Sequence, residues 1–231
     1  SINSKKIIIC AGGIESNLLI LNSLKNKKLK NLKNKKFAGR YFMDHPKCYV
    51  GEIKYPRKEL IKKLKLKYKK NINIYTGLSL FIKNQKTLNT YVRFEEKKTF
   101  FNFKKQLMIR IFLEMEPRYR NRVYIKNKKD YIDLLISKNE IEISKKLIKR
   151  ILEFFSLRPS KEKSKFNVKK LIGASHHIGG LSYPKIVDKN LKLQGLKYIY
   201  CCSSAVFPTS GSVNPTLIIC ALSERLGSYL I

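Results

Sequence analysis

The sequence predicts a mixed α+β / α/β fold, with a strand–helix unit at each end of the chain and a β-sheet between them. A β-branched apolar run near the start leads through two glycines into a helix-like segment. Strand-like runs dominate from residue 48 to residue 125. A second strand, a turn of small residues and a helix-like segment close the chain.

The 231 residues are enough for one large domain or two small ones. A hydrophobic content of 43% and an aromatic content of 11% exclude a disordered or fibrous protein. The longest apolar stretches, residues 7–10 and 217–222, fall short of the ~20 residues that cross a bilayer, so no membrane span is expected. No signal-peptide pattern precedes the first strand, which favours a cytoplasmic location, and the start at Ser1 favours the later part of a longer protein.

The charge is strongly positive, since 50 Lys and Arg face 16 Asp and Glu, for a formal net charge of +34. Such a charge suits a polyanionic partner such as nucleic acid. The lysines are spread evenly among Asn, Ile, Tyr and Phe, however, so a bias toward A/T-rich codons explains them equally well. No zinc-finger or helix-turn-helix pattern is present, and nucleic-acid binding is therefore kept as an unfavoured alternative.

The first unit reads as a buried strand over residues 6–10, a turn at Ala11-Gly12-Gly13 and a helix over residues 15–21. Glycines at such a turn let the backbone approach a ligand, and the first N–H groups of the helix form an anion site. A plain strand-to-helix turn explains the segment equally well, so both interpretations stay open.

In the middle of the chain, a Lys- and Asn-rich connector over residues 26–36 leads to a loop in which His45 precedes Pro46. His45 is interpreted as a structural histidine in a loop. Strands are predicted over residues 48–53, 76–82, 107–115 and 122–125, with a solvated segment over residues 57–70. An amphipathic helix is predicted from Ser144 to Phe155, and a boundary loop over residues 156–165.

Chemistry-bearing residues concentrate after residue 173. The adjacent His176 and His177 point to different sides of an extended chain, so they do not predict a metal site. A lone imidazole beside a glycine loop suits a base, although a buried structural histidine is the common alternative. A strand over residues 199–202 and a turn over residues 209–212 precede a helix that opens at Pro215, with Asn214 as its cap. The five cysteines contain no C-x-x-C pair and are expected to be reduced and buried.

Several ordered motifs resemble the glucose–methanol–choline (GMC) flavin oxidoreductases. The resemblance lies in Ile8-Ile9-Cys10-Ala11-Gly12-Gly13-Ile14-Glu15-Ser16, Gly39-Arg40-Tyr41-Phe42-Met43-Asp44-His45-Pro46, Glu116-Pro117 with Asn121-Arg122-Val123, His176-His177-Ile178-Gly179-Gly180, Ser204-Ala205-Val206-Phe207-Pro208-Thr209 and Asn214-Pro215-Thr216-Leu217. It implies FAD as cofactor, with residues 1–45 and 166–231 in the FAD-binding part. Residues 46–165 would form a substrate domain with a mostly antiparallel sheet covered by helices.

The resemblance also implies the site. His176 takes the position of the catalytic histidine and Asn214 the second active-site position. Cofactor contacts are implied for Ala11, Gly12, Ser203, Ala205, Asn214, Pro215 and Thr216. His176 would take the proton of a substrate hydroxyl while hydride passes from the carbinol carbon to flavin N5. The substrate class is an alcohol or a sugar, and the electron acceptor is not indicated.

The sequence departs from the family in two ways. The N-terminal dinucleotide-binding unit is not in the sequence, so the chain is expected to need that segment, or a separate chain, to hold FAD. Ser203 stands where relatives often carry an acidic residue. A truncated or inactive GMC relic therefore remains the main alternative to an active oxidoreductase.

Overall fold

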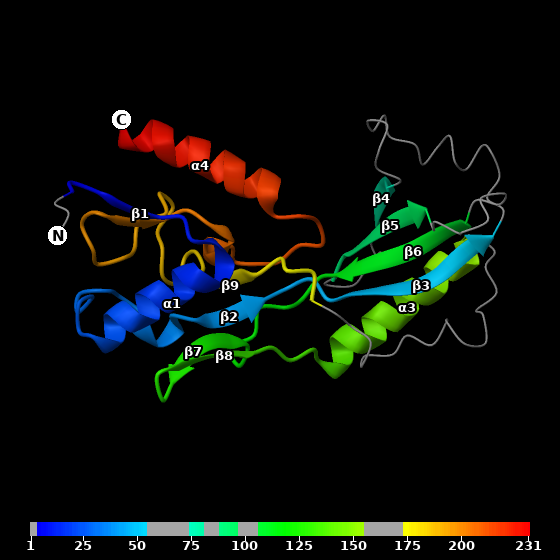
Figure 1. Ribbon diagram of the computed structural model, residues 1–231, viewed down its shortest axis with the longest axis horizontal. Coiled ribbons are helices and arrows are strands. Elements are labelled where there is room, and N and C mark those ends of the chain that lie inside the picture. The colour runs from blue at the N-terminus through cyan, green and yellow to red at the C-terminus, as the bar shows by residue number, and fades with distance from the viewer. Residues whose placement is uncertain (1–3, 55–73, 81–87, 97–105, 155–172) are drawn as a thin grey trace.

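The computed structural model describes residues 4–54, 74–80, 88–96, 106–154 and 173–231. Its elements form two lobes that lie side by side along the long axis (Figure 1). One lobe contains both ends of the chain and the helices α1 and α4, and the other contains strands β3 to β6 and the helix α3. This is the mixed α/β fold that the sequence predicts.

The two ends of the chain meet in a small parallel sheet. Strand β1 (Ile7–Ile9) pairs in parallel with β10 (Ile199–Cys201), and Ile8 lies opposite Tyr200. The helix α1 (Gly12–Lys25) follows β1 almost at once, as the sequence predicts, but it begins three residues earlier and ends four residues later. Residues from both ends share one hydrophobic core, which includes Ile9, Ile20, Cys201, Val206 and Leu226.

A second sheet, in the order β8-β7-β2-β9, lies in the same lobe. Its strands are β2 (Arg40–Met43), β7 (Arg122–Lys126), β8 (Lys129–Asp133) and β9 (Ile178–Gly180), and all pairings are antiparallel. Asn127 and Lys128 join β7 to β8 with positive φ angles of 51° and 60°, which is the backbone of a tight hairpin turn. Of these four strands the sequence analysis predicted β7 and missed β2, β8 and β9.

The third sheet, in the order β3-β6-β5-β4, is antiparallel throughout. Its strands are β3 (Lys47–Lys54), β4 (Ile74–Leu80), β5 (Thr90–Glu96) and β6 (Gln106–Leu113). The helix α3 (Lys138–Phe154) packs against this sheet, because Ile148 and Ile151 share a hydrophobic cluster with Phe94 and Ile109. The antiparallel sheet with a covering helix is thus confirmed.

The predicted start of α3 at Ser144 is wrong by six residues. The Oγ atom of Ser137 accepts a hydrogen bond from the N–H of Glu140, and the Glu140 carboxylate accepts one from the N–H of Ser137. This reciprocal pair is a capping box, which stabilises the first helical turn. The Glu140 side chain is buried. Its carboxylate also accepts a hydrogen bond from the N–H of Glu116 and forms an ion pair with Arg118.

The cap of the last helix also differs from the prediction. The helix α4 (Thr216–Leu230) has Pro215 as its N-cap, with no side-chain hydrogen bond at the cap. Asn214 is therefore not the capping residue. Most of α4 is exposed, and Leu217 and Ile218 present apolar side chains to solvent.

Some predictions fall outside the described residues, namely the segments over residues 57–70 and 156–165 and the end of the strand over residues 76–82. The boundaries after residues 45 and 165 stay a prediction. In the described part of the chain, no helix combines the length and the apolar character needed to cross a membrane. The cysteines are free, but they are not all buried: Cys201 and Cys202 are buried, Cys48 is half-buried, and Cys10 and Cys220 are exposed.

Candidate functional site

The segments that follow β1 and β10 lie next to each other. The N–H of Cys202 donates to the carbonyl of Ile9 at 2.9 Å, and the hydroxyls of Ser16 and Ser203 lie 3.3 Å apart. The turn at residues 11–13 and the 3₁₀ helix η3 (Ser204–Val206) therefore meet at the carboxyl ends of two parallel strands. Ligands of open α/β sheets bind at that edge.

The predicted cofactor residues at this edge divide into two groups. Ala11 and Gly12 are exposed. Ser203 is only 3% exposed and Ala205 is fully buried. The Ser203 hydroxyl accepts a hydrogen bond from the N–H of Ala205 and caps η3. Ser203 and Ala205 thus hold the loop from inside, whereas Ala11 and Gly12 face outward.

Two helix N-termini offer N–H groups that no side chain caps. The N-cap of α1 is Ala11 and that of α4 is Pro215, and neither position has a side-chain hydrogen bond. A Cβ atom added at Gly12 would meet no atom within 4 Å, so there is open space beside the start of α1. Such N-termini bind anionic groups such as phosphate. The first turn of α1 carries Glu15, whereas that of α4 carries no acidic residue, so α4 is the less hindered of the two.

The second glycine of the turn is explained by packing within the chain. A Cβ atom at Gly13 would lie 2.1 Å from the carbonyl oxygen of His177. The Nδ2 atom of Asn17 donates to the carbonyls of Gly13 at 2.7 Å and Gly179 at 2.9 Å. The hydroxyl of Ser204 donates to the carbonyl of His177 at 2.6 Å. The histidine segment is therefore held directly against the start of α1 and against η3.

His176 lies at the junction of the two lobes. Its ring atom Nδ1 is 2.9 Å from Nδ1 of His45, and its ring stacks on Phe112 of β6 with centroids 6.3 Å apart. Its backbone N–H donates to Oδ1 of Asp44 at 3.0 Å. The side chain is half-buried, so the ring is fixed in place and still reaches solvent.

His45 is the residue whose importance the sequence analysis missed. It is fully buried, and its Nε2 atom lies 3.1 Å from the carbonyl oxygen of Ser210. Its backbone N–H donates to Oδ1 of Asp44 at 2.6 Å, so one carboxylate oxygen holds both histidine segments. His45 lies in a loop, as predicted, and its ring contacts His176. The motif around Asp44 and His45, which resembles a family motif, was the signal available in the sequence.

Burial lowers the pKa of both imidazoles. For His45 the loss of hydration is the largest cause, and it outweighs the hydrogen bond to Ser210 and the charge of Asp44, which raise the pKa. For His176 burial is again the largest cause, followed by the neighbouring His45, while Asp44 raises the pKa and Lys47 and Arg93 lower it. Both rings are therefore neutral at pH 7, as a proton-accepting histidine must be.

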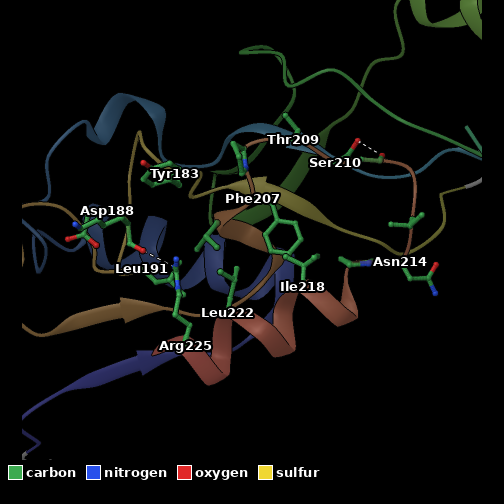
Figure 2. A pocket seen from close by; sticks show the side chains of 16 residues that line it. Tyr183, Asp188, Leu191, Phe207, Thr209, Ser210, Asn214, Ile218, Leu222 and Arg225 are labelled. Carbon is green, nitrogen blue, oxygen red and sulfur yellow. Dashed lines mark hydrogen bonds between the residues drawn. The ribbon is translucent and has the colours of Figure 1, made fainter. Parts of the chain in front are cut away.

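Asn214 is exposed on the loop that leads into α4. It lies at one end of a pocket of about 530 Å³ whose wall includes Phe207, Ile218 and Leu222 (Figure 2). His176 does not line this pocket, and no hydrogen bond joins it to Asn214 among the described residues. Ser210 links the two places, since it lines the pocket and its carbonyl contacts His45. Pro215 lines the same pocket, and Thr216 follows it at the exposed start of α4.

The fold and the site together define an α/β protein with an imidazole at a junction of lobes and with the N-terminus of α1 packed against the same histidine segment. Residues 117–223, somewhat less than half of the chain, match the family model described as GMC oxidoreductase. The match supports a GMC oxidoreductase C-terminal portion over these residues, which include both His176 and Asn214. No curated protein matches the chain. Within the described residues, no group of three or more His, Cys, Asp or Glu side chains could hold a metal ion.

Proposed function

We propose that the chain forms the substrate-oxidising part of an FAD-dependent oxidoreductase that acts on the CH–OH group of an alcohol or a sugar. The family match supports an oxidoreductase. The observation that carries the proposal is the setting of His176, a neutral imidazole that is held by Asp44, His45 and Phe112 and remains partly open to solvent.

In this proposal the imidazole of His176 accepts the proton of the substrate hydroxyl as the carbonyl product forms. The family resemblance assigns the side-chain amide of Asn214 a hydrogen bond to the same oxygen, where negative charge develops, although Asn214 and His176 do not line one pocket in this structure. FAD, when bound, supplies the acceptor for the hydride that leaves the carbinol carbon. Within the described part of the chain, Nε2 of His176 has no hydrogen-bond partner and is free to meet a substrate.

The cofactor would be held by the two open helix N-termini, with Ala11 and Gly12 at α1 and Asn214, Pro215 and Thr216 at α4. Ser203 and Ala205 would support the loop between them from inside. Parallel sheets are normally covered on both faces, yet Ile7 and Ile8 of β1 are about half exposed. We therefore expect a further segment or a separate chain to cover this surface and complete the FAD site.

Replacement of His176 by Ala should slow the reduction of FAD by substrate about 10²-fold or more, because the proton of the hydroxyl then has no acceptor. The measurement is anaerobic stopped-flow absorbance of the flavin-loaded protein, with the bound FAD quantified beforehand. The matched control is His177→Ala. The ring of His177 stacks on Phe42, so its removal should leave the rate within a few-fold of that of the unmodified protein. Unchanged reduction in His176→Ala would refute the assignment, and a purified protein that takes up no FAD with its completing segment would favour the relic.

A further inference from the structure

Three groups in the site form a continuous line of hydrogen bonds. The carbonyl oxygen of Ser210 lies 3.1 Å from Nε2 of His45, and Nδ1 of His45 lies 2.9 Å from Nδ1 of His176. Each bond needs one proton between its two atoms. These two hydrogen bonds therefore restrict which ring nitrogens carry hydrogen. The proposed function alone does not specify those positions.

The carbonyl end of the line fixes the first proton. A carbonyl oxygen only accepts hydrogen bonds, so Nε2 of His45 must carry a hydrogen. His45 is fully buried, and a second proton on its ring would place a charge where water cannot solvate it. His45 is therefore neutral, as its lowered pKa also indicates, and its Nδ1 atom has a lone pair without hydrogen.

The second proton follows from the first. Since Nδ1 of His45 can only accept, Nδ1 of His176 must carry the hydrogen of the bond between the rings. A neutral His176 then has its lone pair on Nε2. We propose that His45 is a positioning residue that fixes His176 in the Nδ1–H tautomer, so that Nε2 is the atom that takes the substrate proton. The role of Nε2 as the proton acceptor rests on the proposed function, whereas the assignment of the tautomer does not.

This arrangement suits a base. Uptake of a proton at Nε2 leaves the bond from Nδ1 of His176 to His45 unbroken, so no partner has to move during the reaction. The opposite tautomer would place two lone pairs 2.9 Å apart and leave the base atom blocked by His45. Asp44 fixes the backbones of both histidines from one side, and Lys47 and Arg93 contribute positive charge near His176.

The tautomer can be read directly by long-range ¹H–¹⁵N correlation spectra of the full chain labelled with ¹⁵N-histidine, near pH 7.5. The chain has three histidines, so His177→Gln and the His45 variants assign the signals. We expect a pyrrole-type Nδ1 and a pyridine-type Nε2 at His176. A pyridine-type Nδ1 at His176 would overturn the proposal.

Two variants of His45 separate positioning from general packing. In His45→Asn the side-chain oxygen lies near the former Nδ1 position and can accept the same hydrogen, so His176 should stay in the Nδ1–H form. His45→Leu removes the acceptor, and the His176 signals should shift toward the Nε2–H form that free imidazole favours. An unchanged Nδ1–H form in His45→Leu would contradict the proposal, and the spectrum of the unmodified chain decides the case if that variant does not fold. Because neither FAD nor substrate is needed, a correct tautomer with an unaffected His176→Ala reduction rate would refute only the proposed function.

Discussion

Replacement of Gly13 by Ala should destabilise the chain by about 3 kcal/mol, the upper part of the range for overpacking a closely packed site. The new Cβ atom would lie 2.1 Å from the carbonyl oxygen of His177 and 2.6 Å from its carbonyl carbon. Both are backbone atoms, and Ser204 holds the same carbonyl from another side, so the segment cannot give way cheaply. Urea unfolding followed by circular dichroism measures the change.

The matched control for this prediction is Gly227→Ala in α4. A Cβ atom there would meet no atom within 4 Å, and the residue lies inside a helix, where Ala is preferred over Gly. We expect this variant to be more stable by about 0.5–1 kcal/mol. If Gly13→Ala and Gly227→Ala changed stability in the same direction, the close packing of α1 against the histidine segment would be wrong.

The second large effect is expected at Asp44. Its Oδ1 atom accepts hydrogen bonds from the backbone N–H groups of His45 and His176, and the side chain is only 4% exposed. Asp44→Ala leaves a buried and a half-buried N–H without a partner, which should cost about 3 kcal/mol of unfolding free energy. The same substitution should loosen His176 and slow substrate-driven FAD reduction.

Asp44→Asn separates the hydrogen bonds from the charge. It keeps an acceptor oxygen and should recover a large part of the lost stability. The control is Asp130→Ala on the exposed face of β8, which should change stability by less than about 0.5 kcal/mol. Equal stability of Asp44→Ala and the unmodified chain would show that this carboxylate does not hold the two segments together.

Local patterns in the sequence were sufficient to predict α1, β1, β10 and most strands of the antiparallel sheet, because each has a clear apolar period or a glycine boundary. Strand β8 was missed because it lies at the edge of its sheet and four of its five residues are exposed, which leaves no apolar alternation to detect. Strand β5 was missed although Val92 and Phe94 are buried, because charged residues surround them. The start of α3 is marked in the sequence by Ser137 and Glu140, which form a capping pair.

The candidate site was harder to predict than the elements. His176 was singled out from its place in a motif, but its partner His45 is 131 residues away in the chain. The antiparallel pairing of β2 with β9, in which Met43 lies opposite Ile178, brings them together, and no local pattern encodes that pairing. The assignment of Asn214 as a cap failed for a related reason, since the chain enters α4 through Pro215 and leaves Asn214 exposed.

The pH dependence of substrate-driven FAD reduction tests the role of His176 most directly. Because burial lowers its pKa from the ordinary 6.5, His176 is uncharged at neutral pH and becomes protonated only below that value. The rate should therefore be level above pH 7 and fall at a midpoint below pH 6.5. The His176→Ala protein should lose this acid limb together with most of its activity. An acid limb that is centred above pH 6.5, or that persists unchanged in His176→Ala, would contradict the account.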